Sequence, residues 1–129
     1  MIKKKILVSI IIPAYNEAKT IIKIINKISK LKVKNFKFEV VVVDDGSKDK
    51  TLYLLKKNKK KINKLISNKK NLGKGASIKK GIKQSSGKYI FFQDADLEYD
   101  PKNFLQFSNI LYNFDPDIVI GSRFNYLNY

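Results

Sequence analysis

Hydrophobic runs and helical repeats alternate along the chain. Four short runs rich in β-branched and aromatic residues predict β-strands, and they occupy Ile6 to Ile12, Phe38 to Val43, Leu65 to Ile66 and Tyr89 to Gln93. A fifth strand is expected at Asp117 to Gly121. The first two runs are largely apolar, which is typical of strands that are covered on both faces of a sheet.

The segments between these runs favour helices. Isoleucine recurs at helical spacing after the first strand, at Ile21, Ile24, Ile25 and Ile28. Further helices are expected from Thr51 to about Lys61, from Ala76 to Ser85, and from Pro101 through a face of Phe104, Phe107, Leu111 and Phe114. This alternation predicts one α/β domain with an open, mostly parallel sheet and right-handed crossovers.

Polar residues follow the predicted strands. They are Tyr15, Asn16 and Glu17 after the first strand, Asp44 and Asp45 after the second, Asp94 and Asp96 after the fourth, and Arg123 after the fifth. In open parallel sheets, ligands bind beyond the carboxyl ends of the strands. The sequence therefore predicts a polar and largely acidic binding site at one edge of the sheet.

The sharpest feature of this predicted site is Asp94-Ala95-Asp96. Two carboxylates one residue apart at a strand end can both reach a divalent cation or its water ligands. Mg²⁺ takes one or two protein carboxylates and completes its shell with water and phosphates, and Mn²⁺ accepts the same oxygen ligands. The alternative is an ordinary acidic turn whose aspartate caps a helix.

Two other segments also suit a nucleotide. In Asp44-Asp45-Gly46-Ser47, a carboxylate can accept a hydrogen bond from a nucleobase while Gly46 lets the backbone come close; alternatively, one aspartate of the pair caps the next helix. The segment Asn71 to Ser77 places glycines and Lys74 before a helix, and helix N-termini bind phosphates. It is not a Walker A loop, because the order of its residues differs.

Composition narrows the chemistry. The chain has no cysteine and no histidine, so acid–base and metal chemistry fall to carboxylates. The net charge is +16 and Arg123 is the one arginine. Three interpretations of that charge stay open: nucleic-acid binding, attraction to phosphates or anionic membranes, and a lysine-rich composition. We expect no nucleic-acid partner, because no recognition helix is evident. The apolar run from Ile6 to Ala14 is too short to span a membrane.

Five spaced motifs resemble family 2 glycosyltransferases, and dolichyl- or polyprenyl-phosphate mannosyl- and glucosyltransferases in particular. The motifs are VSIIIPAYNE at Val8 to Glu17, VVVDDGS at Val41 to Ser47, NLGKGA at Asn71 to Ala76, DADLEY at Asp94 to Tyr99 and GSRF at Gly121 to Phe124. The resemblance implies a GT-A fold, in which helices cover both faces of a Rossmann-like sheet. It also implies transfer of a sugar with inversion, from a UDP- or GDP-linked donor.

The resemblance assigns roles to individual residues. Pro13, Tyr15, Glu17, Asp45, Lys74, Asp94 and Asp96 would bind the donor, with Asp45 on the nucleobase. Asp94 and Asp96, together with Glu98 in a looser match, would hold Mg²⁺ or Mn²⁺. Arg123 would face a phosphate, with a lipid phosphate as a candidate acceptor. No catalytic base is identifiable.

Relatives continue beyond the GSR motif, so residues 1–129 are expected to form an incomplete nucleotide-sugar-binding domain that lacks the acceptor-side segment. The expected location is the cytoplasm, with peripheral contact at the cytoplasmic face of a membrane as a further possibility. Two alternatives stay open. One is a non-catalytic nucleotide-sugar-binding module, and the other is a nucleotidyltransferase of similar architecture.

Overall fold

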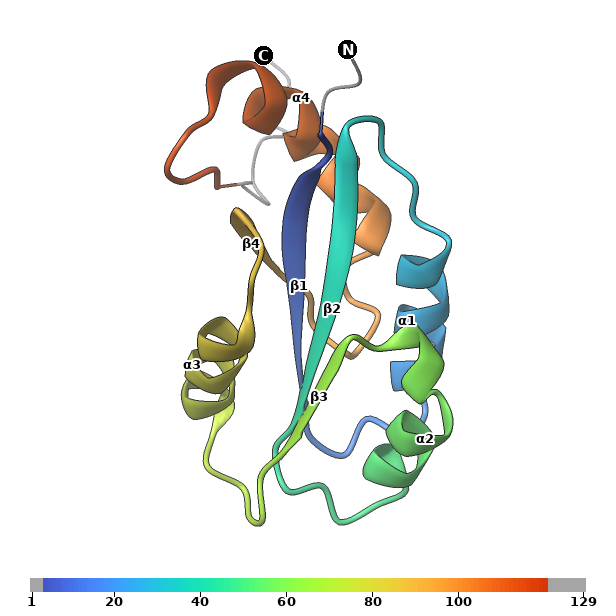
Figure 1. Cartoon of the computed structure of the whole chain (residues 1–129). Helices are drawn as coiled ribbons and strands as arrows, with labels where there is room; N and C mark the ends of the chain where they lie inside the picture. Colours follow the sequence, from blue (N-terminus) through green and yellow to red (C-terminus); the bar gives the residue numbers. More distant parts are fainter. Residues whose placement is uncertain (1–3, 121–129) are drawn as a thin grey trace, which may run out of the picture.

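The computed structural model describes residues 4–120 of the 129-residue chain. Four strands form one sheet in the order β3-β2-β1-β4, and every pair is parallel (Figure 1). The strands are β1 (Ile6–Ala14), β2 (Phe36–Asp44), β3 (Lys64–Ser67) and β4 (Tyr89–Phe92). The prediction of an α/β protein with a parallel sheet is confirmed.

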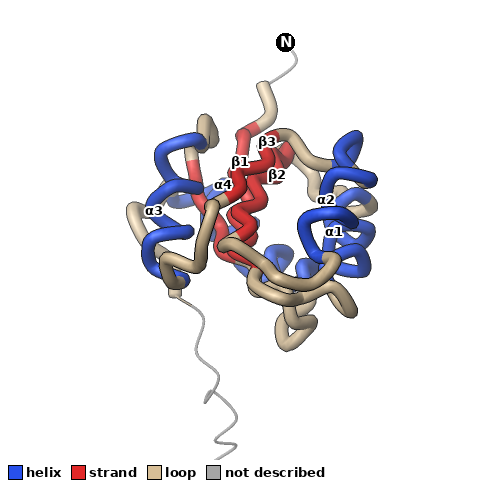
Figure 2. Tube along the Cα trace, turned by 90° about the horizontal axis from the view of Figure 1, so that it is seen from below, coloured by secondary structure: helices blue, strands red, loops and turns tan. Residues whose placement is uncertain are grey.

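Helices cover both faces of this sheet, as predicted. Figure 2 shows α3 on one side of the strands and α1 with α2 on the other. The helical elements are α1 (Ile21–Ser29), α2 (Thr51–Lys57), η1 (Lys59–Lys61), α3 (Lys74–Gln84), η2 (Pro101–Asn103) and α4 (Phe104–Phe114). The helix expected over 51–61 therefore divides into α2 and a short 3₁₀ turn, and α3 begins two residues before its predicted start.

The two long strands supply the centre of the core. Ile10 and Ile12 of β1 face α1, and four of the five isoleucines of α1 are buried in the same cluster. Ile11 points to the opposite face and meets α3 at Gly81, where an added Cβ would lie 2.6 Å from the Ile11 methyl group. Gly81 therefore lets α3 pack closely on β1. Because β1 is buried on both faces, its sequence is apolar apart from the buried Ser9.

A second core cluster forms around Phe104, the first residue of α4. Its fully buried ring meets Phe36, Phe38 and Phe91 edge to face, at centroid distances of 5.3, 5.1 and 5.5 Å. Such edge-to-face pairs add stability beyond the burial of area. This cluster fixes α4 against β2 and β4.

The predicted strand from Asp117 to Gly121 is wrong over its described part. Residues 117–120 have no regular secondary structure, and the Ile118 and Ile120 side chains are 77% and 85% exposed. An apolar run becomes a strand by pairing its backbone, and residues 117–120 join no strand of the four-stranded sheet. Gly121 lies outside the described residues.

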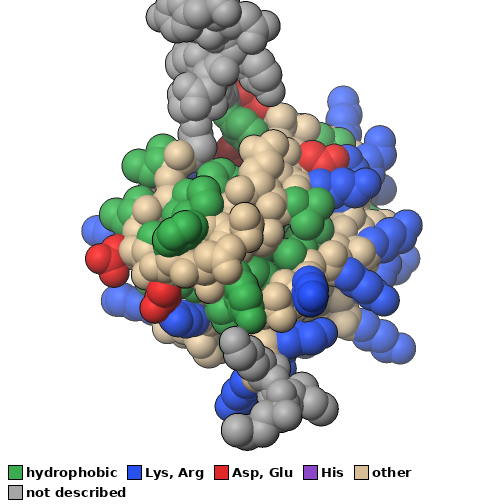
Figure 3. Space-filling model, turned by 90° about the horizontal axis from the view of Figure 1, so that it is seen from above, with side chains coloured by type: hydrophobic (Ala, Val, Ile, Leu, Met, Phe, Trp, Pro, Cys, Tyr) green, Lys and Arg blue, Asp and Glu red, His purple; other side chains and the backbone are tan. Residues whose placement is uncertain are grey.

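Charged and apolar side chains occupy different parts of the surface. Figure 3 shows lysine side chains along the side that carries α1 and α2, while hydrophobic side chains gather elsewhere on the same view. The exposed apolar residues of α4 and the segment after it are Leu105, Ile110, Tyr112, Phe114, Ile118 and Ile120. None of the helices in residues 4–120 is long and apolar enough to cross a membrane.

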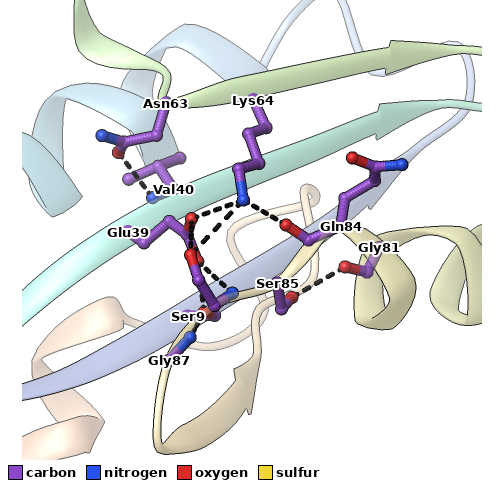
Figure 4. A network of polar contacts seen from close by, with 10 residues as sticks. Ser9, Glu39, Val40, Asn63, Lys64, Gly81, Gln84, Ser85 and Gly87 are labelled. Atoms are coloured by element: carbon purple, nitrogen blue, oxygen red, sulfur yellow. Dashed lines mark hydrogen bonds and ion pairs between the residues drawn. The ribbon is translucent and has the colours of Figure 1, made fainter.

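A buried carboxylate ties the C-terminal end of α3 to the sheet (Figure 4). Glu39 of β2 accepts hydrogen bonds from the Ser9 hydroxyl at 2.5 Å and from the backbone and hydroxyl of Ser86 at 2.9 and 2.6 Å. Lys64 of β3 pairs with it at 2.9 Å. Gly87 N–H donates to the Ser9 oxygen at 2.8 Å. Burial raises the pKa of Glu39, but these hydrogen bonds outweigh burial and hold it at about 2, against a usual 4.5.

We predict that Glu39→Gln destabilises the protein at neutral pH and flattens the dependence of its stability on pH. A carboxylate whose pKa is lowered on folding contributes stability above the unfolded pKa of 4.5, and that contribution is lost as the pH falls towards about 2. A shift of this size corresponds to roughly 3 kcal/mol. Urea unfolding at pH 7 and pH 3 measures it. Asp117→Asn, which removes an exposed carboxylate, is the control; equal pH dependence in both variants would contradict the prediction.

The turn after β2 packs on a distant loop through Gly46. Its φ is +70°, and an added Cβ would lie 2.4 to 2.8 Å from the backbone of Lys70 and Asn71. Gly46 is therefore needed for backbone contact with residues 70–71. The expectation that Gly46 also lets the backbone come close to a nucleobase stays a prediction.

We predict that Gly46→Ala lowers the free energy of unfolding by about 2–4 kcal/mol, because it combines left-handed backbone strain with overlap of backbone atoms. Gly75→Ala is the matched control, since an added Cβ there meets nothing within 4 Å. In α3 it should leave stability unchanged or raise it by up to about 1 kcal/mol. Urea unfolding curves compare the two, and similar losses in both would refute the assignment of Gly46 to backbone packing.

Candidate active site

A cavity of about 460 Å³ opens at the carboxyl ends of β1, β2 and β4. It brings together all the described residues that the sequence analysis assigned to donor or metal binding, namely Pro13, Tyr15, Glu17, Asp45, Lys74, Asp94, Asp96 and Glu98. Ala14, Asn71, Gly73, Ser77 and Ala95 complete its lining. Arg123 lies outside the described residues. The individual roles of these residues stay predictions.

Interlaced turns position the residues that follow β1. Asn16 adopts a left-handed backbone with φ 52°, and its N–H donates to the Ser47 hydroxyl at 3.0 Å. In return, Lys48 N–H donates to the Asn16 side chain at 2.8 Å. Glu17 N–H donates to the Thr51 hydroxyl at 2.9 Å. These bonds join the ends of β1 and β2, so Tyr15 and Glu17 face the cavity from a fixed loop.

The carboxylate bonded to the first residue of α2 belongs to Asp49, not to Asp44 or Asp45, and no side chain caps this helix. Oδ1 of Asp49 accepts the Thr51 N–H at 2.9 Å at the start of that helix. Asp44 instead closes its own turn by accepting from Ser47 N–H at 3.3 Å. The interpretation that one member of the Asp44-Asp45 pair caps the following helix is therefore wrong.

Asp45 anchors the loop that leads into α3. Its buried carboxylate accepts hydrogen bonds from Leu72 N–H at 2.8 Å, from Gly73 N–H at 3.0 Å and from the Asn68 amide at 3.0 Å. Burial raises the pKa of Asp45, but these bonds and one from Ser77 outweigh burial and leave the pKa below 3.8. Asp45 is therefore ionised at neutral pH and holds the loop next to the cavity.

Asn68 is a residue of this site that the sequence analysis missed. It is buried, and its amide group donates to Asp45 and to the Ser77 hydroxyl at 3.0 and 3.3 Å. Its Oδ1 accepts from Lys80 at 2.5 Å. Asn68 directly follows β3, so the rule that polar residues after strand ends form the site could have identified it.

The acidic segment after β4 is held by backbone contacts. The Thr20 hydroxyl donates to Ala95 O at 2.5 Å, and the buried Gln93 amide donates to Tyr99 O at 2.7 Å. Asp96 accepts from Glu98 N–H at 3.0 Å. Asp94 forms an ion pair with Lys74 at 2.6 Å across the cavity.

These carboxylates fit a divalent ion that arrives with a phosphate ligand. Asp94, Asp96 and Glu98 line one cavity. Within residues 4–120, however, no three acidic side chains converge closely enough to hold a metal alone. Mg²⁺ is commonly bound through one or two carboxylates, with water and substrate phosphates completing its shell. These carboxylate oxygens therefore suit Mg²⁺ or Mn²⁺ that is bound together with a nucleotide.

Known proteins share this fold and these motifs. Dolichyl-phosphate beta-glucosyltransferase of Dictyostelium discoideum is 37% identical, over 92% of this chain and 40% of the relative. Residues 1–349 of TarS of Staphylococcus aureus, solved in complex with UDP-GlcNAc, superpose with a TM-score of 0.69 at 32% identity, over 81% of this chain and 31% of that solved chain. The mannosyltransferase PcManGT of Pyrobaculum calidifontis, solved with GDP-Man and Mn²⁺, gives 0.61 at 27% identity, over 71% and 28%.

The chain thus spans well under half the length of these relatives. The sequence profile described as Glycosyl transferase family 2 matches residues 9–128, which is nearly the whole chain. The TM-scores place the four-stranded sheet and its helices within the GT-A fold. The chain therefore belongs to glycosyl transferase family 2.

Proposed function

We propose that this chain forms the donor-binding part of an inverting glycosyltransferase. The donor would be a UDP- or GDP-linked sugar, and the acceptor a lipid phosphate such as a polyprenyl phosphate. One observation carries the proposal: the cavity at the strand ends gathers Asp45, Asp94, Asp96 and Lys74 from different segments of the chain. Carboxylates for a metal, a lysine for phosphate and a polar pocket for a base are the groups that a nucleotide sugar requires.

The described residues divide the donor between them. Pro13, Tyr15 and Asp45 lie on the β1 and β2 side and would contact the nucleoside. Lys74 at the start of α3 would contact the diphosphate, where the helix N-terminus also favours negative charge. Asp94 and Asp96, with Glu98 nearby, would hold Mg²⁺ or Mn²⁺, which when bound would neutralise charge on the departing diphosphate.

The relatives support this class of donor. TarS was solved with UDP-GlcNAc and PcManGT with GDP-Man and Mn²⁺. Family membership also favours sugar transfer over nucleotidyl transfer. The Dictyostelium relative is named for dolichyl phosphate, and such an acceptor is already anionic, so it needs little help from a base. Arg123 would bind that phosphate, and the enzyme would work in contact with a membrane surface.

We predict that Asp94→Asn and Asp96→Asn each weaken the binding of UDP or GDP in the presence of Mn²⁺ by tenfold or more. Each substitution removes a charged oxygen ligand. With EDTA present, both variants should bind the nucleotide as well as the parent or better, because a negative charge near the diphosphate is gone. Calorimetric titration measures both conditions.

Asp117→Asn is the control for these two variants, since it removes an exposed carboxylate outside the cavity lining. It should bind the nucleotide like the parent. Mn²⁺-dependent affinities for Asp94→Asn and Asp96→Asn equal to that of the parent would count against metal binding at this pair. Failure of the parent to bind any nucleotide diphosphate would count against the proposed function as a whole.

We also predict that Asp45→Asn reduces affinity for UDP and GDP more than affinity for pyrophosphate. A site that hydrogen-bonds a base loses discrimination when its charged acceptor is replaced. Asp45 also anchors the loop before Lys74, so Asn68→Ala serves as the comparison: it loosens the same loop and leaves the Asp45 charge in place. Competition titrations with the three ligands measure both variants. A uniform loss in both would assign Asp45 to loop anchoring alone.

A further inference from the structure

One ion pair links two residues with different proposed ligands. Lys74, proposed to bind phosphate, lies 2.6 Å from Oδ1 of Asp94, proposed to bind the metal. Of the ion pairs within residues 4–120, this is the one whose partners both line the cavity. The ammonium group of Lys74 thus contacts a carboxylate oxygen that a divalent cation would need.

The surroundings of Lys74 leave its side chain free to move. Lys74 is the first residue of α3. The N–H of the preceding Gly73 donates a hydrogen bond to Asp45 at 3.0 Å. Gly73 and Gly75 on either side border open space, since a Cβ added at either would meet nothing within 4 Å. The lysine side chain is 63% exposed and Asp94 33% exposed. The backbone of Lys74 is therefore fixed while its ammonium group can leave Asp94 without rearranging the fold.

Electrostatics determine which cation contacts Asp94. Without a ligand, the ammonium group balances the charge of Asp94. A divalent cation would carry twice that charge and would take the same carboxylate oxygens as ligands. It would repel an ammonium group held on the same carboxylate. The diphosphate of a donor would offer that ammonium group an alternative anionic partner.

We propose that Lys74 is a tethered counter-ion that occupies Asp94 in the ligand-free site and exchanges it for the divalent cation when the nucleotide binds. Lys74 then pairs with the diphosphate. This inference rests on the proposed function. It predicts that Lys74 has opposite effects on the binding of the two ligands. Lys74 opposes binding of the metal alone and favours binding of the nucleotide. The exchange therefore selects the metal–nucleotide complex over the free ion.

The test uses Lys74→Met, whose side chain has similar length and no charge. The affinity for Mn²⁺ without nucleotide, measured from the electron paramagnetic resonance signal of free Mn²⁺, should rise about two- to fivefold, the range expected for loss of an exposed ion pair. The affinity of the same variant for UDP in EDTA should fall severalfold. Lys74→Arg, which keeps the charge, should restore both values towards those of the parent.

Lys79→Met is the matched control, because Lys79 is an exposed lysine of the same helix outside the cavity lining. It removes the same charge and should change either affinity much less than Lys74→Met does. Unchanged or weaker Mn²⁺ binding by Lys74→Met, or equal effects of both substitutions, would overturn the inference while the proposed function stands. If Asp94→Asn binds Mn²⁺ as tightly as the parent does, Asp94 does not hold the metal, and the inference is then overturned as well.

Discussion

Two buried carboxylates, one in β2 and one just beyond its end, hold α3 at both of its ends. Glu39 binds the segment after the helix through Ser86, and Asp45, just beyond the strand, binds the segment before it through Leu72 and Gly73. Six residues separate the two, which spans about 20 Å in a strand. The 11-residue helix is about 16 Å long. The positions of Glu39 and Asp45 along β2 and its end therefore fix where α3 lies.

This arrangement ties stability to the site. The anchor at Asp45 sets where α3 begins, and Lys74 is its first residue. A lysine at that point can reach across the cavity to Asp94 at the end of β4, although β1 lies between β2 and β4 in the sheet. An isolated ion pair on so exposed a surface contributes little to folding. The position of this ion pair is therefore better explained by a ligand that would bind in the cavity than by a contribution to folding stability.

The sequence pattern was sufficient for the parts of the molecule that depend on local chemistry. Continuous apolar runs identified the buried strands, and polar residues after them identified the cavity, because parallel strands end at one edge. It failed where the outcome depends on partners far along the chain. Asp49 rather than Asp44 or Asp45 bonds the start of α2, residues 117–120 join no strand, and Gly46 packs on a loop 24 residues away. No local pattern records which distant backbone a carboxylate or a glycine will meet.

The lining of the cavity is acidic although the chain as a whole is basic. The chain carries +16 overall, which would attract the proposed diphosphate ligand from a distance, yet the cavity itself presents Glu17, Asp94, Asp96 and Glu98. These carboxylates would repel the same diphosphate at short range. A bound cation would remove that repulsion, and the ion pair of Lys74 with Asp94 already offsets part of the negative charge. The attraction of anions at long range and the discrimination between ligands at short range would therefore come from different residues. A substitution in the cavity would then change which ligand stays bound without changing the rate at which anions arrive.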